Sequence, residues 1–330
     1  RRPPRSTQSR SSAASDVYKR QIIMSTVGVK EFSQHFGCDE TEIADKTKEV
    51  IQKYDFSYKK CTQEERDKII HEVQGKIKND IQEIGSPIRT DIWAKGWGEN
   101  LTAFNENNSE DAFTPKFIRP SEVMRLNGDF IKPTDYNFER NFSYVMRSYI
   151  CENYLIPYKN IHEFGSGSGF HLIPITRRFP DKNIYGSDFV QTAVDLINNV
   201  AKHHDYNLSA SLFNFIEPDY DYNIPESSVI CTFGALEQVA SKYNKFLDFL
   251  LEKKPELCIH IEPAVEMYDE KNLVDSLAIK FHRKRGYSEG MISKLEAMDK
   301  SGKIKLLKVK RLNFGGLMFE GFTLIVWKSL

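Results

Sequence analysis

Residues 161–188 read IHEFGSGSGFHLIPITRRFPDKNIYGSD, and this stretch decides the fold. A short apolar segment ends in an acid, three glycines alternate with single residues, and a helical run and a second short strand follow. The acid before the loop is Glu163, the glycines are Gly165, Gly167 and Gly169, and Asp188 ends the second strand. Alternating glycines let a backbone turn tightly and approach a ligand with no Cβ in the way. An acid at the next strand tip suits a ribose diol, so the stretch predicts a nucleoside-containing cofactor.

The spacing of the glycines distinguishes between the known classes of nucleotide-binding loop. A dinucleotide fingerprint, G-x-G-x-x-G, would need its third glycine at the position of Phe170 or Leu172. A phosphate loop that ends in Gly-Lys-Ser/Thr is absent from the stretch as well. The spacing therefore disfavours a nicotinamide-dependent reductase, which stays open only as an alternative hypothesis.

The pattern E-x-G-x-G-x-G resembles the first motif of the class I S-adenosylmethionine-dependent methyltransferases. Glu163 and the three glycines match that motif position by position, and Asp188 matches the acid of the second motif. The resemblance covers about residues 158–330. It implies an α/β fold with a Rossmann-like, seven-stranded, mostly parallel sheet and an antiparallel C-terminal hairpin. It also implies S-adenosylmethionine as the cofactor.

The resemblance assigns each part of the cofactor to residues at the strand ends. Glu163 and the loop, Ser166 included, suit the ammonium and carboxylate of the amino-acid end, and Asp188 suits the ribose. Phe189 would stack on the adenine. Asn214 would form hydrogen bonds with it, and Phe215 would provide an apolar wall. The family usually has Asp at the position of Asn214, but an Asn side chain can also accept from and donate to an adenine. A helix-capping role is the alternative for Asp188.

Alternating and apolar segments downstream predict the remaining strands. The expected strands are 160–164, 183–187, 208–212, 228–233, 257–261, 303–312 and 321–327, with a polar helical insert over 269–300.

Methyl transfer to oxygen needs a positioned acceptor and a nearby base. His260 and Glu237 are the candidate catalytic residues, with a structural histidine and a helix-capping acid as the respective alternatives. Tyr136, Arg140 and Glu262 are the candidate substrate residues. We expect a small-molecule acceptor such as a sugar, and the alternative is a non-catalytic scaffold that binds the cofactor or its demethylated product.

Upstream of the motif, the sequence predicts a leader and a cap. Residues 1–23 are rich in Arg and Ser, resemble translated adaptor sequence and are expected to be non-native and disordered, with Met24 as the first native residue. Residues 24–150 are expected to form a helical cap or lid, and 151–330 the cofactor-binding domain. Within the cap, 85–120 is expected to be an irregular loop that carries Trp93 and Trp97.

The composition limits the kinds of binding partner that can be expected. The 330 residues contain 46 Lys and Arg and 46 Asp and Glu, so no basic surface for nucleic acid is indicated. No apolar run has the length of a membrane span. The five cysteines are scattered without metal-ligand spacing, which favours a cytoplasmic protein with no metal.

Overall fold

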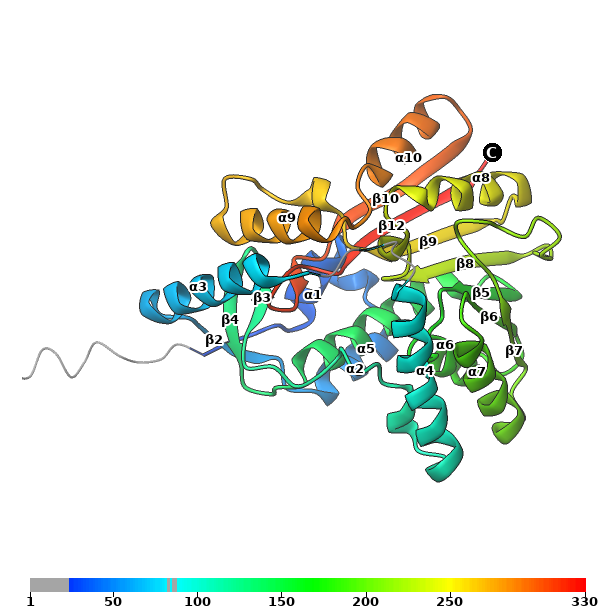
Figure 1. Cartoon of the computed structure of the whole chain (residues 1–330), viewed down its shortest axis with the longest axis horizontal. Helices are drawn as coiled ribbons and strands as arrows, with labels where there is room; N and C mark the ends of the chain where they lie inside the picture. Colours follow the sequence, from blue (N-terminus) through cyan, green and yellow to red (C-terminus); the bar gives the residue numbers. More distant parts are fainter. Residues whose placement is uncertain (1–23, 82–83, 85–87) are drawn as a thin grey trace, which may run out of the picture.

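The main body of the chain is a seven-stranded sheet covered by helices on both faces (Figure 1). The computed structural model describes residues 24–81, 84 and 88–330, and the predicted leader 1–23 lies outside them. The strand order is β10-β12-β9-β8-β5-β6-β7, and only β12 runs antiparallel to its neighbours. The strands are β5 (Asn160–Phe164), β6 (Asn183–Asp188), β7 (Leu208–Leu212), β8 (Ser228–Phe233), β9 (Leu257–Glu262), β10 (Ile304–Arg311) and β12 (Thr323–Ser329). The predicted sheet and its C-terminal antiparallel pair are confirmed.

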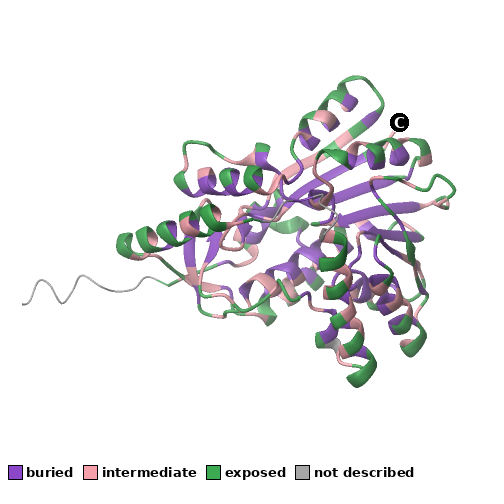
Figure 2. Ribbon diagram, viewed as in Figure 1, coloured by how far each residue is buried: buried purple, intermediate pink, exposed green. Residues whose placement is uncertain are grey.

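Side-chain alternation divides the core between the two faces of this sheet. Ile259 and Ile261 of β9 pack in one apolar cluster, and Cys258 of the same strand packs in another. The first cluster holds residues of α5, α6 and α7, and the second holds residues of α8 and α10. These helices are α5 (Phe138–Ile150), α6 (Leu172–Arg178), α7 (Gln191–His204), α8 (Asn244–Lys253) and α10 (Met291–Lys300). Figure 2 shows the strands of the sheet as mostly buried.

A second, five-stranded sheet corrects the expectation of a purely helical N-terminal cap. Its order is β1-β2-β4-β3-β11. The strands are β1 (Met24–Thr26), β2 (Ser57–Lys60), β3 (Met124–Leu126), β4 (Asp129–Pro133) and β11 (Phe314–Gly315). Asn127 and Gly128, both at positive φ, form the tight turn between β3 and β4. Local periodicity missed this sheet because its strands are short and β11 comes from the other end of the chain.

The helices of the cap pack around this second sheet and beside the first. They are α1 (Val29–Phe36), η2 (Glu40–Glu42), α2 (Asp45–Lys53), α3 (Gln63–Asn79), α4 (Ile88–Asn107) and η3 (Glu110–Phe113). Thr62 caps α3 by accepting a hydrogen bond from the backbone N–H of Glu65, while Glu65 accepts from the N–H of Thr62. The remaining short helical turns are η4 (Cys151–Leu155), η5 (Leu236–Tyr243) and η6 (Val265–Met267).

Helix α4 replaces much of the irregular loop expected over 85–120. Gly96 and Gly98 favoured a loop, but a glycine inside a helix costs only about 1 kcal/mol relative to alanine. Gly98 faces Thr192 of α7, where a Cβ would lie 3.6 Å from the Thr192 methyl group. The close packing of α4 on α7 therefore compensates for the glycines.

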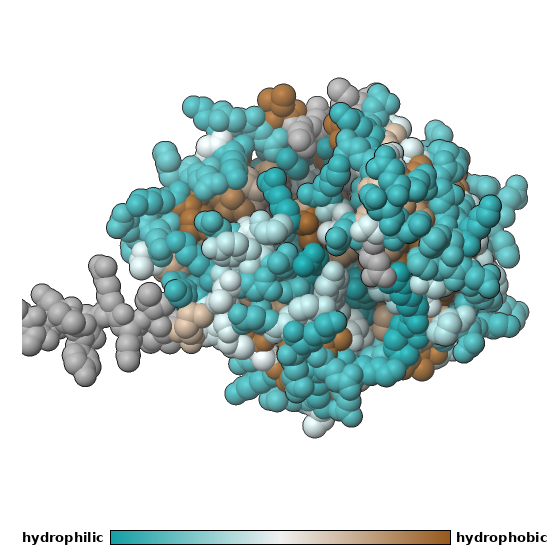
Figure 3. Space-filling model, turned by 90° about the horizontal axis from the view of Figure 1, so that it is seen from below, coloured by the Kyte–Doolittle hydropathy of each residue, from teal (hydrophilic) through white to brown (hydrophobic). Residues whose placement is uncertain are grey.

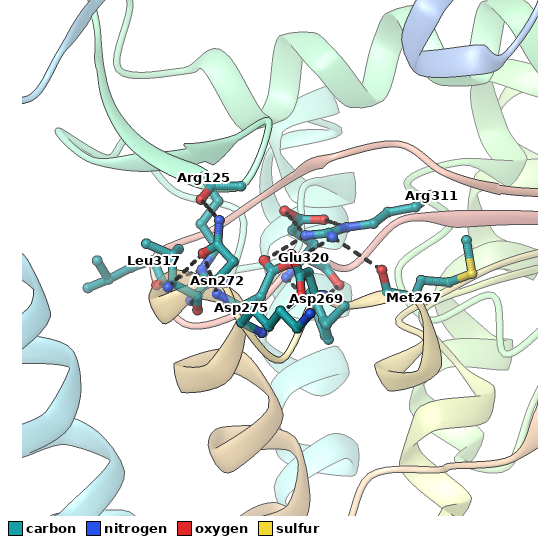
Figure 4. Close-up of polar contacts among 12 residues, drawn as sticks. Arg125, Met267, Asp269, Asn272, Asp275, Arg311, Leu317 and Glu320 are labelled. Atoms are coloured by element: carbon teal, nitrogen blue, oxygen red, sulfur yellow. Dashed lines mark hydrogen bonds and ion pairs between the residues drawn. The ribbon is translucent and has the colours of Figure 1, made fainter.

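The predicted insert over 269–300 forms two helices, α10 and α9 (Leu273–Arg285), separated by Gly286 in the left-handed conformation. A buried ion network fixes α9 to the end of β10 (Figure 4). Arg311 donates two hydrogen bonds to Asp275, at 2.8 and 2.7 Å, and two to Glu320, at 2.6 and 2.9 Å. Burial alone would lower the pKa of Arg311, but these contacts with Glu320 and Asp275 outweigh it and raise the pKa.

No helix among the described residues is both long and apolar enough to cross a membrane. The face of the molecule drawn in Figure 3 is mainly hydrophilic, and hydrophobic residues show there in small separate patches.

The ion network predicts a large stability loss for Arg311→Met. The Asp275 and Glu320 side chains are each 2% exposed, so removing the cation leaves two buried carboxylates without their partner. The free energy of unfolding, measured by urea denaturation, should fall by about 3–5 kcal/mol.

The matched control is Lys68→Met, which breaks a bridge with Glu64 whose side chains are 74% and 80% exposed. This change should move the free energy of unfolding by less than about 0.5 kcal/mol. A loss below about 1 kcal/mol for Arg311→Met would contradict the importance of the network.

Candidate functional site

The glycine loop lies where the strand order of the large sheet reverses. β5 has β6 on one side and β8 on the other, so the chain leaves β5 at the switch point where open α/β sheets bind ligands. The backbone N–H groups of Gly165 and Ser166 both donate to the carbonyl oxygen of Ser187, at 2.8 and 2.9 Å. The Ser166 hydroxyl donates to the same oxygen at 3.1 Å. The loop is thereby held against the end of β6.

At all three glycine positions, both the backbone conformation and the neighbouring atoms disfavour any residue with a side chain. Their φ angles are +74°, +51° and +78°, in the region that L side chains rarely adopt. A Cβ at Gly165 would lie 2.4 Å from the Ala235 Cβ, and one at Gly169 would lie 2.7 Å from Ile173 Cδ1. The glycines thus let the loop pack on β8 and α6.

Gly167 is covered by an aromatic ring, which differs from the open bend that the sequence predicts. A Cβ at Gly167 would lie 2.7 Å from Cζ2 of Trp97, on α4. Trp97 is 8% exposed and stacks on Trp93 with ring centroids 5.4 Å apart. Because Gly167 has no side chain, the indole of Trp97 can lie against it. Any ligand at the loop must share this space with Trp97.

Asp188 is bonded to the glycine loop itself. Its Oδ2 accepts from the Gly167 N–H at 2.9 Å, and its Oδ1 accepts from the Val190 N–H at 3.2 Å. Burial raises the pKa of Asp188 to about 6, although the N–H groups of Gly167, Val190 and Phe189 act in the opposite direction. Two carboxylate oxygens have about four acceptor positions, so these backbone donors do not use all of them. The structure brings Asp188 and the loop together, as the sequence predicts.

Glu163 is buried beneath the loop with an unsatisfied oxygen. The residue is 2% exposed, and its Oε2 has no hydrogen-bond partner among the described residues. Burial raises the pKa of Glu163 well above its usual range, with Arg147 lowering it and Asp188 raising it further. A buried acceptor of this kind favours a donor, so Glu163 fits the ammonium group of an amino-acid ligand.

The three residues predicted to surround an adenine differ in their burial and contacts. Phe215 is buried, lies 3.5 Å from a Cβ built at Gly165, and packs edge-on to Phe246 at 4.6 Å. Asn214 is exposed, and its Oδ1 accepts from the Ile216 N–H at 2.9 Å. Phe189 is 41% exposed. Their roles toward an adenine remain predictions.

Glu262 makes contacts that hold the backbone after β8, and its predicted contact with substrate stays a prediction. Its carboxylate accepts hydrogen bonds from the backbone N–H groups of Ala235 and Leu236, each at 3.1 Å, and of Glu237 at 3.4 Å. The residue is 2% exposed. It therefore anchors the loop after β8, and that loop presses Ala235 against Gly165.

Glu237 is the remaining acid after β8. Burial, followed by the charge of Glu262, raises the pKa of Glu237 to about 8. Its Oε1 accepts from Gln238 Nε2 at 2.8 Å, and Gln238 Oε1 accepts from Arg89 of α4 at 2.7 Å. The sequence indicated Glu237 but gave no sign of Arg89.

His260 lies in the core, which favours the alternative of a structural histidine, and its role as a base stays a prediction. It is fully buried, its Nδ1 is 2.9 Å from Thr232 Oγ1, and its ring lies 6.2 Å from that of Trp327. Burial lowers the pKa of His260 to about 3. The alternation of β9 placed it correctly opposite the isoleucines but could not tell how far along the strand the site begins.

Tyr136 and Arg140 lie at the start of α5, and the structure does not join them to the loop. Tyr136 is 50% exposed and Arg140 is partly buried. Among residues 24–81, 84 and 88–330, neither forms a hydrogen bond or ion pair with 165–169. Their role toward substrate stays a prediction.

No protein-family model matches the chain, and no curated protein matches it either. Solved structures do match. Magnesium protoporphyrin IX methyltransferase from Synechocystis, with bound SAH, is 11% identical, with a TM-score of 0.42 over 58% of this chain and 84% of that one. Human N-acetylserotonin methyltransferase in complex with SAM is 12% identical, with a TM-score of 0.38 over 57% and 55%. The cyclase SpnF is 9% identical, with a TM-score of 0.41 over 56% and 79%.

At these identities and TM-scores the likenesses carry no conclusion about this chain, and the fold rests on its own topology. The order of the seven strands, the single antiparallel strand β12 and the glycine loop after β5 are the features expected from the sequence. The chain has a Rossmann-like α/β fold with a seven-stranded, mostly parallel sheet.

The buried carboxyl of Glu163 predicts an unusual pH dependence for Glu163→Gln. Because the pKa of Glu163 is raised in the folded protein, ionisation costs stability as the pH rises above the carboxyl's unfolded value. Glutamine keeps the shape without the charge. The variant should be more stable than the parent by about 1–3 kcal/mol at pH 8, and the difference should shrink toward pH 4.

Urea denaturation at several pH values measures this difference, with the exposed Glu226→Gln as the control that should show no such trend. A Glu163→Gln protein that is less stable than its parent at pH 8 would mean that the carboxylate has a partner in the folded protein.

Proposed function

We propose that this protein is an S-adenosylmethionine-dependent methyltransferase that methylates an oxygen atom of a small molecule. The observation that carries the proposal is the buried, unpartnered Oε2 of Glu163 beneath a glycine loop that also holds Asp188. The two carboxyls match the two hydrogen-bond-donating parts of this cofactor, its ammonium group and its ribose diol. The cofactor supplies an electrophilic methyl group, and the protein holds the acceptor in line with it.

The chain's own residues divide the work of binding. Glu163 would accept from the ammonium group, and the free acceptor positions of Asp188 would take the ribose hydroxyls. Trp97 would either stack on the bound cofactor or move off Gly167 to admit it, because its ring already contacts the loop. Phe215 would form an apolar wall where it meets Gly165.

Glu237 is the proposed base for the acceptor hydroxyl. It follows the loop that contacts Gly165, and its raised pKa suits proton transfer near neutral pH. Gln238 and Arg89 orient it through a chain of hydrogen bonds. A sugar or a similar hydroxyl compound is the proposed acceptor, and a cytoplasmic location is proposed with it.

The second candidate function is a non-catalytic protein that binds the cofactor or its product. The covering of Gly167 by Trp97 favours this candidate, because a closed loop suits slow exchange of ligand better than turnover. Incubation of the full chain with radiolabelled S-adenosylmethionine and fractionated cell extract separates the two. Methyl transfer to a fraction supports the enzyme, and binding without transfer to any fraction supports the scaffold.

Asp188→Ala should weaken S-adenosylmethionine binding by at least tenfold, about 1.4 kcal/mol, as measured by isothermal titration. The variant removes acceptors for the ribose hydroxyls and also the contact with the Gly167 N–H. Asp188→Asn keeps the shape of the side chain and should weaken binding as well, because the amide has only one acceptor oxygen.

Asp181→Ala, at an exposed turn, is the control and should bind as the parent does. Unchanged affinity in both Asp188 variants would remove Asp188 from the cofactor site.

The proposed base predicts a rise of kcat/KM with pH. Glu237 accepts a proton only when it is ionised, so the rate should increase through pH about 8 and then level off. Glu237→Gln should lower kcat by about 10²–10⁴-fold and abolish this inflection. The measurement uses the acceptor fraction identified by methyl transfer, and the same inflection in the variant would exclude Glu237 as the base.

A further inference from the structure

A hollow of about 540 Å³ lies beside α5 and α6. Residues of α2, α5, α6 and the segment after η3 line it. Phe170, the residue after the glycine loop, forms part of its wall together with Tyr54, Tyr144 and Phe113. The ring centroids of Tyr144 lie 5.6 Å from Tyr54 and 6.0 Å from Phe170, so the wall is a continuous aromatic surface.

Arg147 is a buried cation at this hollow. It is 9% exposed and donates one hydrogen bond, from Nη1 to the carbonyl oxygen of Phe170 at 2.9 Å. Its guanidinium carbon lies 4.9 Å from the ring centroid of Tyr144 and 5.4 Å from that of Phe170. Among the described residues no carboxylate forms an ion pair with it. A guanidinium has five N–H donors, so most of the capacity of Arg147 is left for a ligand.

The rim of the hollow adds further positive charge. Besides Arg147, four basic and two acidic side chains line the hollow, an excess of two positive charges. One of the two acids, Glu152, is already paired with Arg178 at 2.9 Å. Lys46 and Lys53 are exposed on α2, at the opening. A buried cation with cations around it favours an anion, because an uncompensated buried charge is costly.

We propose that this hollow binds a small aromatic oxyanion, with its phosphate or carboxylate at Arg147 and its ring against Tyr144, Tyr54 and Phe170. The planar guanidinium can hold two oxygens of such a group in parallel. The aromatic wall supplies the apolar contacts that a bare inorganic ion cannot use. Arg147 also acts on the proposed cofactor site, since its charge lowers the pKa of Glu163. The test of the hollow nevertheless needs neither cofactor nor acceptor.

Isothermal titration of the full chain with phenyl phosphate tests the proposal, with inorganic phosphate as the comparison. Phenyl phosphate should bind with a Kd below about 1 mM and at least about tenfold more tightly than phosphate. Arg147→Met should weaken the binding of phenyl phosphate by at least about tenfold, since it removes the charged donor.

Two further variants keep the test decisive if Arg147→Met does not fold. Lys53→Glu at the exposed rim should weaken phenyl phosphate about fivefold, and Tyr144→Leu should reduce its advantage over phosphate. Lys245→Glu makes the same charge change on α8, outside the lining of the hollow, and should leave binding unchanged. Failure of phenyl phosphate to bind, or binding that Lys53→Glu and Tyr144→Leu both leave intact, would overturn the proposal.

Discussion

The hydrogen bond from the Gly167 N–H to the Asp188 carboxylate is the contact on which the site depends. It ties the loop after β5 to the tip of β6, and the two bonds to the Ser187 carbonyl oxygen fix the same junction. The positive φ angle of Gly167 makes the contact possible, since an L side chain there would be strained and would meet Trp97. The geometry of the loop therefore follows directly from the alternating glycines of the sequence.

Burial dominates the electrostatics of the strand ends. It raises the pKa of four carboxyls at one edge of the sheet, so each loses its proton at a higher pH than usual. They are Glu163, Asp188, Glu237 and Glu262. Asp188 and Glu262 have backbone N–H donors that stabilise the ionised form, whereas one oxygen of Glu163 has no partner. The unsatisfied acceptor marks where a cationic ligand would gain most, and for this reason the cofactor proposal centres on Glu163.

The sequence predicted the parts of the fold that depend on local pattern. The strands of the large sheet and the antiparallel C-terminal pair follow from periodicity. The five-stranded sheet could not be predicted, because β11 joins β3 from almost two hundred positions away along the chain. Helix α4 was missed because Gly96 and Gly98 suggested a loop, whereas Gly98 packs against Thr192 of α7, which only the tertiary structure shows.

The sequence likewise predicted only part of the candidate site. The loop and Asp188 share a short stretch of sequence, so their proximity follows from the strand-loop-helix-strand order. The depth of His260 and the backbone contacts of Glu262 depend on how far each side chain lies from the strand end, which alternation alone does not give. Trp97 was recognised as an aromatic residue of interest, but its contact with Gly167 depends on the packing of α4.

Amide hydrogen exchange of the full chain with and without S-adenosylhomocysteine tests the central claim most directly. Slower exchange is expected at 165–169, at 188–190 and in the part of α4 around Trp97, because a ligand held by Glu163 and Asp188 would lie between these segments. Unchanged exchange in all three segments at saturating ligand, or protection confined to other parts of the chain, would contradict it.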